Sequence, residues 1–256
     1  MSPADSQRVR RELRVIGPFQ VRVDGQVRPM PHSAERVLAV VALVGPLARS
    51  RAAALLWPDA NPSRAGANLR AALSRLGDVA EGFVHVSGEV LALAEEASLD
   101  LEAAFAWINA TIYDDVLPVA GAPPAWIGRT LLPGWEDGWL TGPNERLQML
   151  EAQALESAAE RLLAAGHPDG ALPYALSAVE VQPWSESANR LTIEIHARRG
   201  DPSNALRHYR RFRHALGQEL GVEPGPDIRA AIRQLYPFGN PLVDPVDPAD
   251  PQAARS

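Results

Sequence analysis

Residues 61–76, NPSRAGANLRAALSRL, decide how the rest of the chain is interpreted, because their pattern predicts an amphipathic helix. Asn61 is a favoured N-cap residue, and Pro62 suits the first helical position, where no backbone hydrogen bond is lost. At about 100° per residue, the leucines and two of the alanines share one side, which we expect to pack on a core. These core residues are Ala65, Leu69, Ala72, Leu73 and Leu76.

The opposite side of this predicted helix is cationic, with small residues between its polar ones. Arginine can bond guanine twice in the major groove of DNA, asparagine can do the same with adenine, and alanines allow close approach. No acidic residue lies between Asp59 and Asp78. The pattern favours a face that reads DNA, and a merely solvated surface helix is the alternative that the stretch alone leaves open. The candidate contacts are Ser63, Arg64, Asn68, Arg70, Ser74 and Arg75.

Composition excludes several classes of protein. The chain has 256 residues, 46% hydrophobic and 22% charged, which allows two globular domains with separate cores. It has no cysteine, which excludes disulfides, thiolate nucleophiles and zinc fingers. It also has no lysine, which argues against phosphate-loop and Schiff-base chemistry. No run is long enough to span a membrane and no signal peptide is visible, so we expect a cytoplasmic protein without membrane contact.

Charge is divided unevenly along the chain. Residues 1–80 contain 12 Arg and 6 acidic residues, a balance of +6. Residues 81–256 contain 13 Arg and 25 acidic residues, a balance of −12. A basic N-terminal region on an acidic remainder is typical of a DNA-binding head whose body is not itself attracted to phosphate.

The order of elements around residues 61–76 predicts a winged helix-turn-helix. Alternating apolar residues over 13–27 indicate a small antiparallel sheet with a hairpin at Asp24-Gly25. A largely buried helix follows from Ser33, and a hairpin turning at Gly88 follows residues 61–76. In this arrangement the third helix enters the major groove, and the hairpin lies along the DNA backbone.

A short helix over residues 50–56 precedes the proposed reading helix and has two arginines at its start. Arg49 and Arg51 are candidate contacts to backbone phosphates. Each could equally be a solvated surface charge, and the sequence leaves this alternative open.

The C-terminal half contains an internal repeat. Residues 166–172 and 200–206 share Gly, Pro, Ala and Leu in register at an offset of 34 residues, the length of a tetratricopeptide unit. Amphipathic helices expected over 144–165 and 226–236 would complete the stack. The Pro/Gly-rich passage 113–143 carries three tryptophans, which we expect to serve packing and not ligand binding. These are Trp126, Trp135 and Trp139.

The predicted fold class is an α+β winged helix-turn-helix followed by an all-α, tetratricopeptide-like domain, mainly α overall. The predicted domain limits are 1–98 for the winged helix and 99–236 for the helical domain. Residues 237–256, rich in Pro and Asp, are expected to form a disordered tail. Residues 1–12 are expected to be frayed.

Several motifs together resemble the SARP-type bacterial transcriptional regulators, which join a winged helix to a bacterial transcriptional activator domain. The resemblance covers about residues 13–236. It implies binding of promoter repeats, recruitment of RNA polymerase, and self-association as a homodimer through the helical domain. It also places Asn68, Arg70, Ser74 and Arg75 at recognition-helix positions and the wing at residues 83–93. The motifs are LLWPD (55–59), ANLRAALSRL (67–76), PWSE (183–186) and ALRHYRRFRHALGQELGVEP (205–224).

Two departures from the family pattern predict weak backbone contacts by the wing. Gly77-Asp78 stands where many members have a further basic residue, and the wing carries His85 and Glu89 but no arginine. These departures keep a rival interpretation open, in which the protein is a repeat-type interaction adaptor whose degenerate winged helix no longer reads DNA.

No pattern indicates catalysis. The six histidines lack the spacing of metal ligands, and no serine-nucleophile, dinucleotide or phosphate-loop motif is present. We therefore predict that the protein is not an enzyme and needs no metal or cofactor. The leading hypothesis is a sequence-specific, DNA-binding transcriptional regulator acting as an activator.

Overall fold

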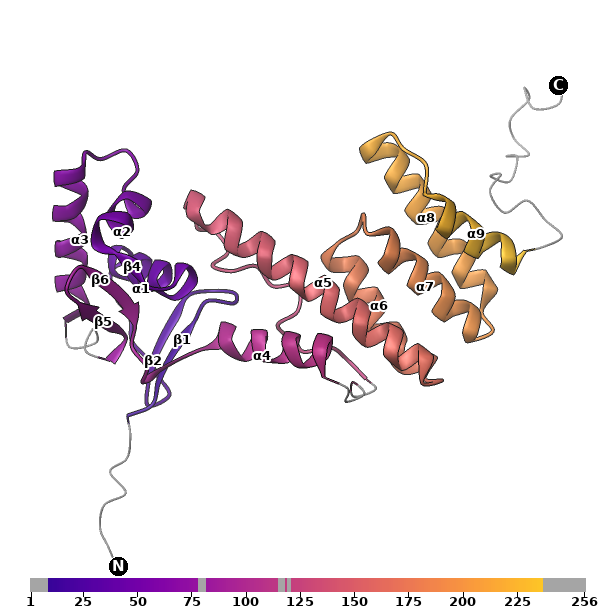
Figure 1. Cartoon of the computed structure of the whole chain (residues 1–256), viewed down its shortest axis with the longest axis horizontal. Coiled ribbons are helices and arrows are strands. Elements are labelled where there is room, and N and C mark those ends of the chain that lie inside the picture. The colour runs from indigo at the N-terminus through magenta and orange to yellow at the C-terminus, as the bar shows by residue number, and fades with distance from the viewer. Residues whose placement is uncertain (1–8, 78–81, 115–117, 119–120, 237–256) are drawn as a thin grey trace, which may run out of the picture. The chain divides into compact units, whose positions relative to one another are not determined.

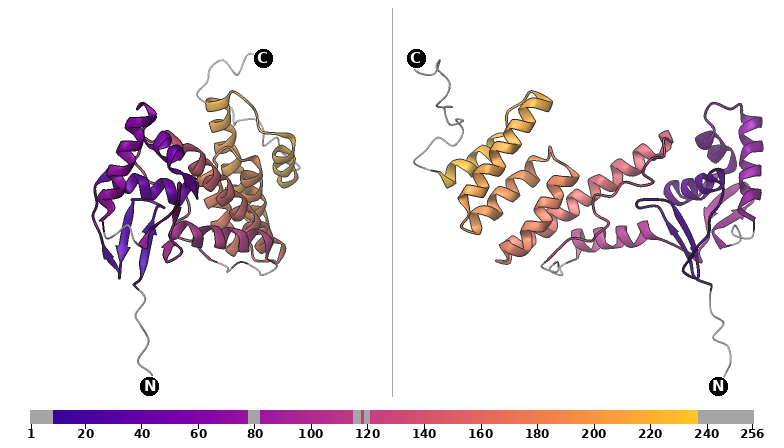
Figure 2. Two further views of the ribbon diagram at one scale, coloured as in Figure 1. Left: turned by 60° about the vertical axis from the view of Figure 1, so that its left-hand side comes forward. Right: turned by 180° about the vertical axis from the view of Figure 1, so that it is seen from behind.

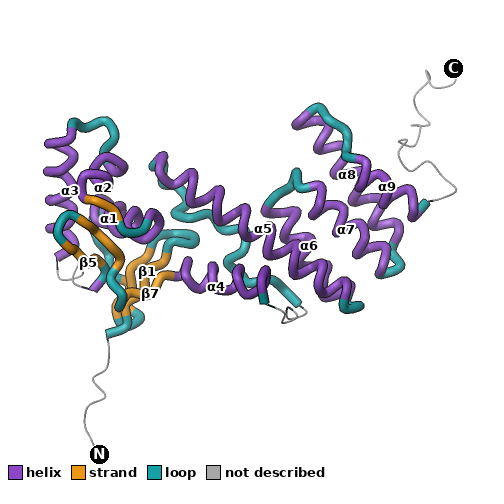
Figure 3. Tube along the Cα trace, in the orientation of Figure 1, coloured by secondary structure: helices purple, strands orange, loops and turns teal. Residues whose placement is uncertain are grey.

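The computed structural model describes residues 9–77, 82–114, 118 and 121–236. Every strand in these residues lies before residue 100, and the described secondary structure after it is helical except for an isolated β-bridge at Leu131 (Figures 1 and 3). The predicted fold class is therefore confirmed. The predicted disordered tail, most of the predicted frayed N-terminus and Asp78 lie outside the described residues.

The chain forms two compact units. Of the described residues, those within 1–108 and 129–147 make up the first unit, and those within 109–128 and 148–236 make up the second. Helix α4, Asp100–Tyr113, and helix α5, Thr141–Ala164, each contribute to both. These units are defined by packing, and the sequence-based limits 1–98, 99–236 and 237–256 stay predictions.

The first sheet of the first unit has the strand order β3-β2-β1-β7. Strand β1 pairs antiparallel with β2 and parallel with β7. The hairpin predicted at Asp24-Gly25 joins β2 to β3, and both residues have positive φ, as such a turn requires. The strands are β1 Arg11–Arg14, β2 Gln20–Val23, β3 Gln26–Val27 and β7 Ala97–Leu99.

Three helices and a second small sheet complete the winged helix. Helix α1 buries most of its apolar residues and packs on α2, α3 and β6 (Figure 1). The second sheet has the order β4-β6-β5, in which β5 and β6 form the predicted wing. The helices are α1 His32–Val44, α2 Arg49–Leu56 and α3 Pro62–Leu76. The strands are β4 Leu47–Ala48, β5 Val84–Ser87 and β6 Val90–Leu93.

Residues 129–147 belong to the first unit through backbone pairing far along the chain. The Gly17 N–H donates to the Thr130 carbonyl at 2.9 Å, and the Leu132 N–H donates to the Val15 carbonyl at 3.1 Å. Trp135 packs on Phe19, with ring centroids 5.6 Å apart, in keeping with the packing role expected of it. The segment therefore continues the structure of the winged helix.

The second unit is built from helices that pack in sequence order. Helix α7 contacts α6, α8 and α9, and α6, α7 and α8 run side by side in the views of Figure 2. Helices α6 and α8 both begin at a proline, Pro168 and Pro202, at the offset of 34 residues noted in the sequence. The helices are α6 Pro168–Val181, α7 Glu186–Arg198, α8 Pro202–Leu220 and α9 Pro226–Leu235.

The buried carboxyl group of Glu151 in the second unit has one oxygen without a hydrogen-bond partner among the described residues. Glu151 on α5 is 2% exposed, and its Oε2 accepts a hydrogen bond from the Gly128 N–H at 3.2 Å. Its Oε1 has no hydrogen-bond partner among the described residues. Burial raises the pKa of Glu151 to about 7, and the bond from Gly128 opposes this shift only in part.

Replacing this buried acid is expected to change how stability depends on pH. Because folding raises its pKa, the Glu151 carboxyl loses its contribution to stability as the pH rises from about 4.5 to about 7. We expect Glu151→Gln to raise the free energy of unfolding by about 2 to 3 kcal/mol at pH 8. At pH 5 the gain should stay below about 1 kcal/mol.

Urea denaturation followed by circular dichroism at both pH values measures this difference. Glu160→Gln, at an exposed position of the same helix, is the matched control and should change neither value. A gain from Glu151→Gln that is the same at pH 5 and pH 8 would contradict the raised pKa.

Candidate nucleic-acid interface

Helix α3 starts and packs as its sequence predicts. The Asn61 side chain accepts a hydrogen bond from the Arg64 N–H at 2.9 Å, and Pro62 takes the first helical position. The buried side consists of Ala65, Leu69, Ala72 and Leu76, while Leu73 is half-buried. The core fixes this side inward, so the opposite side faces outward.

The outer side of α3 exposes most of the predicted contacts. Asn68 is half-buried, and the other candidates on this helix are exposed: Ser63, Arg64, Arg70, Ser74 and Arg75. At 100° per residue, the small residues Ser63, Ala67 and Ser74 lie opposite the buried leucines. Arg64 and Arg75 lie on one flank of this strip, and Arg70 lies on the other. A narrow, cationic ridge of this kind fits the major groove in shape and charge.

One flank of the ridge faces the start of α1. Arg75 Nη1 donates to the Ser33 hydroxyl at 3.1 Å, so this guanidinium already has a partner within the first unit. Arg64 and Asn68 line a hollow of about 780 Å³ together with His32 and Trp135. Asn68 and Arg75 therefore lie beside the start of α1, which the sequence pattern of α3 does not show.

The other flank carries Arg70. Its Nη1 lies 3.6 Å from the point where a Cβ on Gly66 would stand, so the guanidinium extends over a glycine. Within the described part of the chain, the side chains of Arg64 and Arg70 have no hydrogen-bond or ion-pair partner. These two guanidiniums are therefore free to bond an external acceptor.

The start of α2 offers a second cationic position. Arg51 is exposed, whereas Arg49 is half-buried and its backbone N–H donates to the Glu89 carbonyl at 2.8 Å. The N-cap residue Ala48 makes no side-chain bond to the first turn of α2. Uncapped N–H groups next to arginines can donate hydrogen bonds to an anion such as a phosphate. Ser50, which the sequence interpretation did not single out, belongs to the same turn.

The wing presents few cations to a nucleic acid. Val86 and Val90 are exposed on it, and Glu89 stands at its turn. The hairpin contains no arginine. Gly77 and the wing, which depart from the family pattern, belong to the residues that the structure describes. Asp78 lies outside them.

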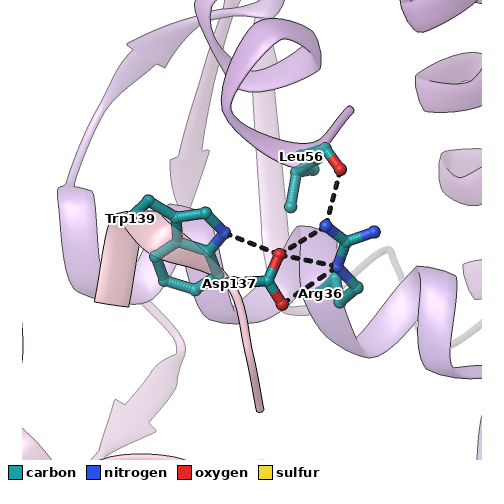
Figure 4. A network of polar contacts seen from close by, with 4 residues as sticks. All are labelled: Arg36, Leu56, Asp137 and Trp139. Atoms are coloured by element: carbon teal, nitrogen blue, oxygen red, sulfur yellow. Dashed lines mark hydrogen bonds and ion pairs between the residues drawn. The ribbon is translucent and has the colours of Figure 1, made fainter. Parts of the chain in front are cut away.

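A largely buried ion pair between Arg36 and Asp137 also contacts the end of α2 (Figure 4). Arg36 on α1 bonds the Asp137 carboxylate through Nε at 3.0 and 3.2 Å and through Nη2. The same Nη2 donates to the Leu56 carbonyl at the end of α2, at 2.5 Å. Trp139 Nε1 donates to Asp137 at 3.1 Å. No local periodicity signals this network, because its partners lie far apart in sequence.

The described residues contain neither a membrane-spanning nor a metal-binding arrangement. Every helix among them is too short or too polar to cross a bilayer. In the same residues, no three histidine or acidic side chains are grouped so as to hold a metal ion. The predicted absence of catalysis and cofactors stays a prediction, as does the DNA-contact role of each candidate residue.

Comparison with known proteins identifies the C-terminal domain and a similar fold. Residues 116–236 match the family described as the bacterial transcriptional activator domain. The fold is similar to that of Mycobacterium tuberculosis EmbR in complex with a low-affinity phosphopeptide. The TM-score is 0.72 at 20% identity, over 92% of this chain and 67% of that chain. No curated protein sequence matches the chain.

A winged helix followed by a bacterial transcriptional activator domain is the architecture of a class of bacterial transcription regulators. In this chain, residues 116–236 match the activator domain, as the resemblance to the SARP-type regulators implies, and a winged-helix fold precedes them.

Proposed function

We propose that the protein binds specific promoter DNA through α3 and activates transcription there. The observation that carries this proposal is the outer side of α3, where unpartnered Arg64 and Arg70 flank a strip of small residues. Acidic residues are absent from the helix. Such a surface can bond base edges with the guanidiniums while the small residues allow close approach.

The proposal extends to the activator domain and its partners. The family match over residues 116–236 supports activation in preference to repression. RNA polymerase is the partner we propose for activation, and homodimerisation through the helical unit and a cytoplasmic location complete the proposal. Tetratricopeptide-type pairing of α6 to α9 would provide the surface, and no catalytic step is involved.

A second function is favoured by one specific observation. The wing has no arginine and exposes Glu89, which reduces attraction to the DNA backbone. A protein-interaction adaptor whose winged helix does not bind DNA would have the same kind of wing. The two functions differ in whether DNA is bound at all.

Fluorescence anisotropy with labelled duplexes separates the two functions. We expect the protein to bind a duplex that carries its target promoter at least about 1000-fold more tightly than a random duplex of equal length. The affinity should fall steeply between about 50 and 200 mM salt, because phosphate contacts release counterions. No binding to either duplex would support the adaptor, and equal affinity for both would reject sequence-specific recognition.

A further inference from the structure

A mainly apolar groove lies between α2 and α3 on the side where the wing turn approaches them. Its volume is about 520 Å³, within the range of small-molecule sites. Small residues on both helices make the space, among them Ala53 and Ala54 on α2 and Gly66 on α3. Trp57, Leu69 and Leu73 supply larger apolar walls.

The polar groups of the groove are few and mostly cationic. Arg49 and Arg70 line it with one acid, Glu89, so the formal charge of the lining is +1. Arg49 Nε is fully buried and has no hydrogen-bond partner among the described residues. A buried guanidinium N–H without an acceptor is unfavourable, so this group favours an anionic ligand that enters the groove.

We propose that this groove binds a small monocarboxylate with an aromatic or short aliphatic body. The apolar walls take the body, and the carboxylate accepts hydrogen bonds from Arg49 and Arg70. A single negative charge balances the lining, whereas a dianion would leave one charge uncompensated next to Glu89. Free phosphate lacks a body that could fill the apolar part of the groove.

Occupation of the groove regulates the proposed DNA binding, a consequence that depends on the function proposed above. Arg70 belongs both to the groove and to the outer side of α3. A guanidinium that bonds a carboxylate in the groove is not available to a base or phosphate. Ligand and DNA therefore weaken each other's binding by the same factor.

Sodium benzoate is a suitable probe, with benzyl alcohol as its neutral counterpart. Calorimetric titration of the full chain without DNA should give a benzoate Kd of about 0.1 to 1 mM, and benzyl alcohol should bind at least about tenfold more weakly. Arg49→Gln should weaken benzoate binding about tenfold. Arg28→Gln, an exposed arginine outside the groove, should leave it unchanged.

Filling the groove gives a second test that does not depend on charge. Ala54 is exposed at the groove, so Ala54→Phe should fold normally and abolish benzoate binding. Full benzoate affinity in Ala54→Phe, equal binding of benzyl alcohol, or no benzoate binding by the wild type would each overturn the site. Benzoate binding that leaves the DNA affinity unchanged would overturn the competition alone. Benzoate binding by a protein without DNA affinity would support the site and reject the proposed DNA binding.

Discussion

The double substitution Arg64→Ala and Arg70→Ala is expected to lower affinity for the specific promoter by about 2 to 6 kcal/mol, roughly 30-fold or more. The two side chains lie on opposite flanks of α3, so their contributions should be close to additive. Each is exposed and without an intramolecular partner among the described residues, so the fold should be unaffected. Anisotropy titration of the promoter duplex at fixed salt measures the loss.

The control for this double variant is Arg207→Ala, which removes an exposed arginine from α8 in the second unit. It removes one positive charge, where the double variant removes two, and it leaves α3 untouched. We expect wild-type DNA affinity from it and unchanged melting temperatures from all variants. A double variant that melts like the wild type and still binds the promoter with full affinity would remove α3 from DNA recognition.

Local sequence signals were sufficient for α3 itself. The cap at Asn61, the proline that follows it and the leucine spacing are all short-range features, and the structure has the helix and its buried side where they indicate. The same holds for the repeat, because Pro168 and Pro202 each begin a helix. Local rules act within a few residues, and these features depend on nothing further away.

The surroundings of the recognition face could not be predicted in the same way. Arg75 meets Ser33 across 42 residues, and Arg36 meets Asp137 across 101. The passage 113–143 has no periodicity, so nothing in its sequence indicated that residues 129–147 would fold into the first unit. Nothing in the sequence around Arg36 marks it as the partner of a residue 101 positions away. Pairings of this kind arise from tertiary packing, which a hydrophobic pattern does not encode.

Asp137→Ala is expected to lower the free energy of unfolding of the protein by about 2 to 3 kcal/mol, because it leaves a largely buried cation without its carboxylate partner. The side chains of Arg36 and Asp137 are 19% and 10% exposed, so water can replace the lost carboxylate only in part. Trp139 Nε1 loses its acceptor as well (Figure 4). Urea denaturation followed by circular dichroism measures the loss.

A double-mutant cycle with Arg36→Met separates the unpaired charge from the loss of packing. Removing both partners should recover most of the stability, since a buried ion pair replaced by apolar groups is often neutral. Glu194→Ala is the matched control, because Glu194 and Arg190 are 37% and 36% exposed and their pair should contribute less than about 0.5 kcal/mol. If Asp137→Ala cost no more than Glu194→Ala, the network would not hold the end of α2 in place.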